Sequence, residues 1–177
     1  MESQRGRTSR RRFLLILGGP LLLAGAGFGV ASALSSDEPD PRRVRTDLAP
    51  LNLRFHAAGE LAEAHWQGYD MDEPVGGDRG IPSPDSRIRL VGVARLGPGQ
   101  VAGILRNPDY SFAAAEPKGL PGRLKPYVPA GAAWQRSEAF DTLMNRPGTD
   151  LFTSSSGEFL LDAERDLICF DVVELYT

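Results

Sequence analysis

The chain has 177 residues, 41% of them hydrophobic, and its 20 basic and 23 acidic side chains give a formal net charge of −3. This length allows one ordinary domain with a tail, and the near balance of charge argues against a dedicated nucleic-acid-binding protein, which usually carries a basic stripe. One cysteine and two histidines exclude an intramolecular disulfide framework and zinc sites built from clusters of cysteine or histidine.

Residues 1–34 have the layout of an export signal. Five arginines lie within residues 1–12, no charged side chain occurs from Phe13 to Leu34, and small residues follow, which are the three regions of such signals. The stretch Ser9-Arg10-Arg11-Arg12-Phe13-Leu14-Leu15 resembles the twin-arginine signal, in which the export translocase reads the arginine pair. The resemblance assigns this role to Arg10, Arg11, Phe13 and Leu14, although Leu15 stands where such signals often have Lys.

The end of the apolar run leaves two alternatives. Ala31-Ser32-Ala33 fits the small-residue cleavage pattern, with Ala31 and Ala33 flanking Ser32 and the cut after Ala33. Without cleavage, Phe13–Leu34 is long enough for an anchor, because roughly 20 apolar residues span a bilayer. The protein would then contact the membrane through residues 13–34. Both alternatives predict that the rest of the chain is exported, to the extracellular space or the outer face of the cytoplasmic membrane.

Residues 35–47 are polar and rich in proline, which predicts a disordered linker, and an extracytoplasmic domain is expected over residues 48–177. The first element is ambiguous, because residues 60–67 have good helix propensity. Flanking glycines and the alternation of Ala62, Ala64 and Trp66 favour a strand instead. Residues 87–96 alternate clearly, with apolar side chains on one face and arginines on the other, which predicts a strand with one partly wet face.

Two short helices are predicted. The first opens with Pro98, which suits the first helical position, and ends before Asn107-Pro108. The second opens with Ser137 as N-cap and ends at Asn145. Each has an apolar stripe at helical spacing: Val101, Ile104 and Leu105 in the first, and Phe140, Leu143 and Met144 in the second.

The C-terminus is predicted to form a hairpin, in which Glu158–Ala163 pairs with Asp166–Tyr176 across a turn at Glu164-Arg165. Both faces of the last strand are largely apolar, so we expect it in the middle of the sheet, and Leu151–Ser154 is a candidate for a further short strand. The sequence therefore predicts an α+β fold: an antiparallel sheet of four to six strands with two short helices on one face, preceded by an N-terminal signal or transmembrane helix.

Motifs for catalysis are missing from the sequence. It contains no Gly-x-Ser-x-Gly and no Ser-x-x-Lys, and the glycines at 97, 99 and 103 miss the dinucleotide spacing. Cys169 lies in an apolar stretch and is expected to be a buried, inert thiol, and His65 beside Trp66 is expected to be structural. We predict no catalytic residue, no metal and no cofactor.

The most unusual stretch runs from Tyr69 to Asp85 and is a long loop rich in Gly, Pro and acidic residues, a type that is often functional. A calcium site is an alternative because its carboxylates are hard ligands, but their spacing misses the EF-hand pattern. We predict a partner-binding surface here, with the candidate residues Trp66, Tyr69, Asp70, Asp72 and Arg79. The alternative for Trp66 is a place in the core.

Trp66-Gln67-Gly68, the glycine-rich loop and Ile81-Pro82-Ser83-Pro84 resemble small exported or membrane-anchored proteins of high-GC Gram-positive bacteria. The use of 18 Arg against 2 Lys fits such a genome. This resemblance implies a location outside the cytoplasm and assigns no catalytic residue. We predict an exported binding or interaction domain with a cell-envelope partner and no nucleic-acid partner. The alternative is a small extracytoplasmic hydrolase or cofactor enzyme, which a pocket joining His65 to carboxyl groups of shifted pKa would favour.

Overall fold

A computed structural model describes residues 40, 42–72, 86–146 and 154–175. The chain divides into two units, residues 1–36 and 37–177, and all described residues belong to the second. The predicted signal with Arg10, Arg11, Phe13 and Leu14, and the cleavage pattern at Ala31 and Ala33, lie outside the described residues. No helix in the described ranges is long and apolar enough to cross a membrane.

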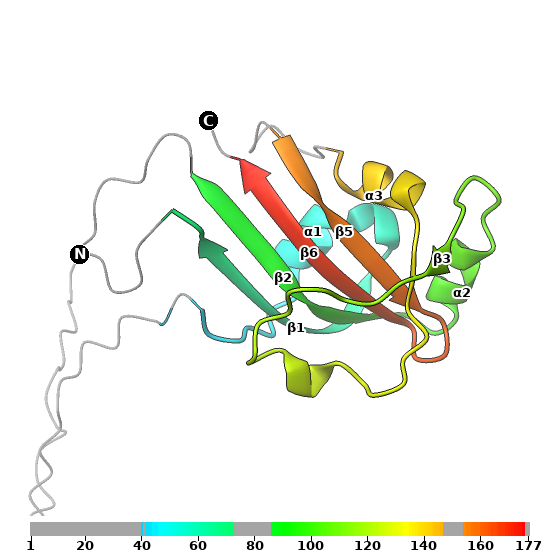
Figure 1. The fold of residues 1–177 in the computed structure, drawn as a ribbon, viewed down its shortest axis with the longest axis horizontal. Helices are drawn as coiled ribbons and strands as arrows, with labels where there is room; N and C mark the ends of the chain where they lie inside the picture. The colour runs from blue at the N-terminus through cyan, green and yellow to red at the C-terminus, as the bar shows by residue number, and fades with distance from the viewer. Residues whose placement is uncertain (1–39, 41, 73–85, 147–153, 176–177) are drawn as a thin grey trace, which may run out of the picture. The chain divides into compact units, whose positions relative to one another are not determined.

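The core of the second unit is a six-stranded antiparallel sheet in the order β1-β2-β6-β5-β4-β3 (Figure 1). Its strands are β1 (Leu61–Asp70), β2 (Arg87–Leu96), β3 (Ala113–Ala114), β4 (Gln135–Arg136), β5 (Ser154–Asp162) and β6 (Leu167–Leu175). The predicted antiparallel sheet of four to six strands, the strand over residues 60–69, the C-terminal hairpin and the central place of its last strand are confirmed. Of the candidate strand at 151–154, residues 151–153 lie outside the described residues.

Three helices, rather than the two predicted, occur in the described ranges: α1 (Ala49–Arg54), α2 (Gln100–Leu105) and α3 (Glu138–Met144), with the 3₁₀ turns η1 (His56–Ala58) and η2 (Lys125–Tyr127). α1 was not predicted, although Pro50 lies in its first turn. α3 begins as predicted, because the Ser137 hydroxyl accepts a hydrogen bond from Phe140 N (3.3 Å).

α2 begins later than predicted. Pro98 lies before the helix, and Gly99 is the N-cap with a φ of +75°, in the left-handed region that favours glycine. The carboxylate of Asp166 accepts hydrogen bonds from Gly99 N (2.9 Å) and Val101 N (3.3 Å). The cap therefore comes from the β5–β6 turn, which is distant in sequence.

The three helices cover one face of the sheet and form the main core with it. Phe55 packs edge-on against Phe159, with ring centroids 5.4 Å apart. Arg54 ties this layer together, because its guanidinium donates to Glu174, to Met144 O (2.9 Å) and to Ser155 Oγ (2.5 Å). The other large, fully buried members are Leu51, Leu61, Trp66, Leu96, Phe140, Met144, Leu161, Ile168 and Phe170.

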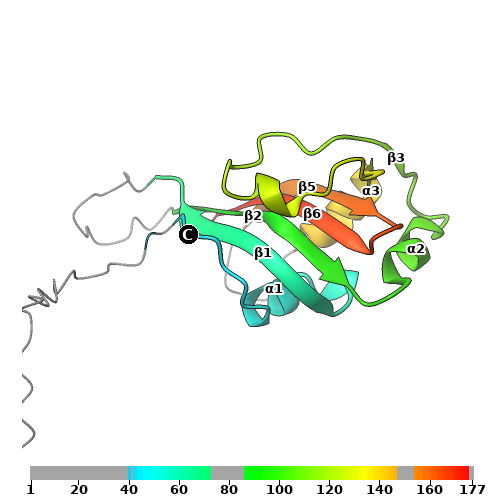
Figure 2. The same cartoon turned by 90° about the horizontal axis from the view of Figure 1, so that it is seen from below.

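The opposite face carries a second, smaller core. Val93, Leu160, Leu167 and Cys169 are buried there under the segment that joins β3 to β4, residues 115–134. Figure 2 shows this segment with η2 on one side of the sheet and α1 on the other. The face predicted to be partly wet is thus covered in its middle, while the Arg95 side chain is exposed near one end.

The described end of the predicted linker is bound to the sheet edge. Arg45 forms an isolated antiparallel bridge with Trp66 through two backbone hydrogen bonds (2.7 and 3.0 Å). The indole N–H of Trp66 donates to Asp47 O (3.0 Å), and the buried amide of Gln67 donates to Arg42 O. The prediction of a disordered linker is wrong for 42–47, because two buried polar side chains of β1 find acceptors there.

Candidate functional site

Trp66 is not available as a contact residue. Its side chain is 2% exposed and belongs to the main core, because the alternation of β1 directs it to the face that the helices cover. The Arg45 guanidinium lies 4.1 Å from its ring centroid. Its prediction as part of a binding surface is wrong, and the alternative that it is a core residue is correct.

The other described candidates lie at the base of the β1–β2 hairpin, and their polar groups have internal partners. Tyr69 Oη accepts from Arg89 (3.1 Å), and Asp70 Oδ1 accepts from the backbone N–H of Asp72 (2.8 Å). The Asp72 carboxylate accepts from Arg87 Nε (3.0 Å), and the guanidinium lowers the pKa of that carboxyl through this hydrogen bonding. The structure brings these residues together as a stem, while Arg79 lies outside the described residues.

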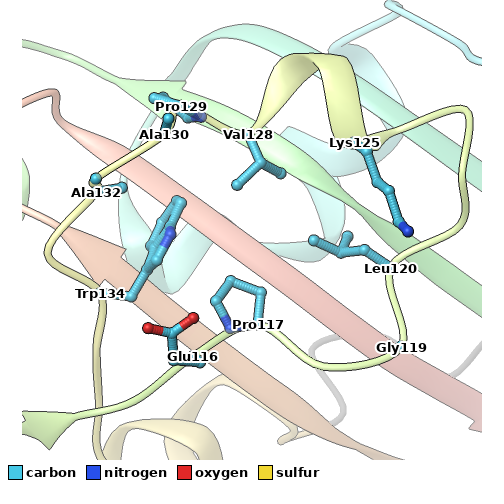
Figure 3. Close-up of a pocket in the computed structure, with 11 residues that line it drawn as sticks. Glu116, Pro117, Gly119, Leu120, Lys125, Val128, Pro129, Ala130, Ala132 and Trp134 are labelled. Carbon is cyan, nitrogen blue, oxygen red and sulfur yellow. The ribbon is translucent and has the colours of Figure 1, made fainter.

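A more open site lies on the second face of the sheet. The segment of residues 115–134 encloses a hollow of about 630 Å³, which we call the loop groove (Figure 3). Two limbs of this segment build it, the first over residues 115–124 and the second over residues 128–134, with η2 between them. Its lining residues are Glu116, Pro117, Gly119, Leu120, Lys125, Val128, Pro129, Ala130, Gly131, Ala132 and Trp134.

Apolar anchors hold the loop groove against the sheet. Trp134 is 5% exposed and packs with Leu120 and Val128 over the second core. Leu124 is fully buried, and next to it in η2 the ring of Tyr127 stacks on His65 of β1, with centroids 3.8 Å apart. The segment is therefore fastened at both limbs and at its middle.

Arg89 fastens the first limb by polar contacts. Its Nη2 donates to Gly119 O (3.1 Å), and the same guanidinium donates to Asp171 (2.8 and 2.6 Å). Hydrogen bonding to Asp171 raises the pKa of Arg89 further above its ordinary value. Gly119 has a φ of +67°, so a residue with a side chain would be strained at this turn.

The charged groups of the loop groove are unpaired. Neither Glu116 nor Lys125 forms an ion pair with any described residue, whereas Arg45, Arg54, Arg87, Arg89, Arg95, Arg123, Arg136 and Arg165 all do. Figure 3 shows Glu116 beside Trp134 at one end and Lys125 near Leu120 at the other. Opposite charges thus flank an aliphatic centre.

The second limb of the loop groove also has free backbone donors. The N–H groups of Ala130 and Gly131 make no hydrogen bond within the described part of the chain, whereas Ala132 closes the turn at residues 130–131. Because these groups line an open hollow, they remain available to a ligand that carries carbonyl groups.

A second hollow, of about 540 Å³, lies between α3 and β5 and is lined by polar residues. Its main groups bind one another: Arg136 Nε donates to Asp141 (2.7 Å), Arg136 Nη1 pairs with Glu158 (2.6 Å), and Asn145 donates to Gly157 O (2.9 Å). Burial raises the pKa of Asp141. Most polar groups of this hollow therefore connect α3 to the sheet, while Glu138 and Arg146 form no ion pair with a described residue.

The residues considered for catalysis do not gather in one place. His65 contacts the Glu63 carboxylate (3.3 Å), and this hydrogen bond lowers the pKa of Glu63. Neither residue lines either of the two hollows described above. Cys169 is 3% exposed and burial raises its pKa to about 12, which confirms the prediction of a buried, inert thiol. Among the described residues, no three of His, Cys, Asp and Glu converge as metal ligands.

Sequence reasoning missed the loop groove because its residues form no known motif. Two signals were present: proline and glycine recur at short intervals over residues 115–134, and both lysines of the chain, Lys118 and Lys125, lie in that segment. No protein-family model, curated protein or solved structure matches this chain.

Proposed function

We propose that this chain is an exported domain that binds a ligand or partner of the cell envelope, and that the loop groove is its contact surface. The proposed export rests on the sequence of residues 1–34, in which Arg10 and Arg11 are the pair that the export translocase would recognise. The contact surface comes from the geometry of residues 115–134. The loop between β1 and β2 is a weaker choice, because the polar groups of Tyr69 and Asp72 are already bound to arginines.

The observation that carries the proposal is the pair of uncompensated charges in one hollow. A volume of about 630 Å³ falls within the range of roughly 300–1,000 Å³ for pockets that hold small ligands. Glu116 and Lys125 both line this hollow, and neither has an ion-pair partner among the described residues. Unpaired groups that converge on a concave surface favour ligand binding over a structural role.

The proposal is tested by retention from cell-envelope extract. The full chain is purified in mild detergent, immobilised and incubated with the extract, and bound material is identified by mass spectrometry. The groove variant combines Glu116→Gln with Lys125→Met, and the matched control combines Glu60→Gln with Lys118→Met, which are exposed residues outside the groove.

We expect at least one component that the wild type and the control retain and the groove variant loses. Equal retention by the folded groove variant would place the contact surface elsewhere. Turnover of a substrate by the isolated protein would instead favour the hydrolase alternative.

A further inference from the structure

We infer that the loop groove recognises short peptides that carry both a free ammonium group and a free carboxylate. The inference rests on the proposed function and specifies its ligand class. It follows from the order of chemical groups along the hollow: a carboxylate and an indole at one end, aliphatic walls in the middle and an ammonium group at the other end.

The end of the groove at Glu116 suits a cation. The carboxylate has no described cationic partner, and Figure 3 shows it beside the ring of Trp134. An ammonium group placed there donates a charge-assisted hydrogen bond to the carboxylate and is attracted to the aromatic ring. A neutral amide at the same place would gain neither to the same extent.

The opposite end suits an anion. Lys125 leads η2, and its ammonium group has no described carboxylate partner. Arginine side chains nearby are occupied, since Arg89 is bound to Asp171 and Arg123 to Asp40. Lys125 is therefore the cationic side chain among the lining residues that can meet the carboxylate end of a ligand.

The middle of the groove suits an extended backbone. Pro117, Leu120 and Val128 give aliphatic walls, and Ala130 and Gly131 offer backbone N–H groups without partners among the described residues. An extended peptide places carbonyl groups along its length and so satisfies such donors, as in other modes of peptide recognition. A lipid chain would leave these donors unsatisfied, at a cost in free energy.

The test uses the tripeptide Ala-Pro-Ala in four forms: free at both ends, acetylated, amidated, and capped at both ends. Proline keeps the probe extended. Binding to the full chain is followed by tryptophan fluorescence, because Trp134 lines the groove and Trp66 is buried in the main core. We expect each cap to weaken binding about threefold and both caps to weaken it about tenfold, as for exposed ion pairs.

The variants assign each end of the probe. Glu116→Gln should abolish the effect of acetylation and preserve that of amidation, and Lys125→Met should do the reverse. Glu60→Gln and Lys118→Met should change neither effect. All four positions are exposed, and circular dichroism confirms that the variants fold.

Equal binding of the free and doubly capped probes, or an acetylation effect that persists in Glu116→Gln, would overturn the inference. The absence of binding by any probe would also overturn it, and retention from the envelope extract would then decide the proposed function separately. If the groove variant also retains the same extract components as wild type, both the ligand class and the site are wrong.

Discussion

Arg89 joins three parts of the domain through one planar side chain. Its guanidinium binds both oxygens of Asp171 on β6, the hydroxyl of Tyr69 on β1 and the carbonyl of Gly119 in the loop groove. A fork of this kind fixes geometry as well as charge, which lysine cannot imitate. The first limb of the groove is therefore coupled to the packing of the central strands.

Replacing Arg89 by Met should lower the free energy of unfolding by about 1–2 kcal/mol, because the partly buried Asp171 loses its charged partner. Urea denaturation measures the change. The comparison is Arg95→Met. The Arg95 side chain is exposed, with a long contact to Glu63 (3.4 Å) and a hydrogen bond to Arg165 O (2.7 Å), so its loss should cost about 0.5 kcal/mol. Equal losses in the two variants would show that Arg89 has no special role.

Cys169 should lower the free energy of unfolding as the pH becomes alkaline. Burial raises its pKa from 9.0 to about 12, so between these values the unfolded chain releases a proton that the folded chain keeps. The contribution is fully present below about pH 9 and is lost as the pH rises through the folded-state pKa. By pH 12 the loss amounts to roughly 4 kcal/mol from this group.

Denaturation at several pH values between 8 and 11 should show this slope in wild type and a shallower slope in Cys169→Ala, which lacks the thiol. In addition, the folded protein should react with a thiol reagent only as fast as it opens. Rapid labelling at pH 8 without denaturant would contradict the buried, neutral thiol.

At the scale of the elements, β1 and β2 are held in register by a tryptophan packed over a glycine. Trp66 pairs with Gly92 across the two strands, and a Cβ added at Gly92 would lie 2.6 Å from both His65 O and Trp66 Cβ. Backbone atoms of β1 and the Cβ of the buried Trp66 flank the position, so the neighbours cannot move aside cheaply.

We expect Gly92→Ala to destabilise the domain by about 1–3 kcal/mol through overpacking. Gly103→Ala is the matched control: a Cβ there meets nothing within 4 Å and lies inside α2, so it should stabilise by about 0.5–1 kcal/mol. Thermal unfolding of the two variants checks both signs, and a neutral Gly92→Ala would refute the close packing of Trp66 on this strand.

The elements that the sequence predicted well are those with strong local periodicity. β2 has clear alternation, β6 has two largely apolar faces, and α3 has a capping serine. Each of the three elements lies where it was expected. The start of α2 was displaced because its cap, Asp166, comes from a remote turn. The bound segment 42–47 and the loop groove depend on contacts between segments far apart in sequence, such as Gln67 with Arg42 and Arg89 with Gly119, which no local pattern records.

At the scale of the whole molecule, the proposed export signal in residues 1–34 can be tested separately from the proposed binding by the described domain. Arg10→Lys together with Arg11→Lys should trap the precursor in the cytoplasm, since the translocase reads both guanidinium groups. Cell fractionation with an antibody to the C-terminal domain measures the distribution. The control variant, Arg5→Lys with Arg7→Lys, makes the same chemical change outside the arginine pair and should be exported normally. Unchanged export of the Arg10→Lys, Arg11→Lys variant would indicate the general secretory route.

The bridge between Arg45 and Trp66 also bears on self-association. β1 is an edge strand, and an uncovered edge offers alternate backbone groups to a strand of another molecule. Arg45 takes both backbone groups of Trp66 at the middle of that edge, and the guanidinium lies over the indole. A second copy therefore cannot add a continuous strand along β1, so a segment that looked like a spacer keeps neighbouring copies of the domain from joining their sheets.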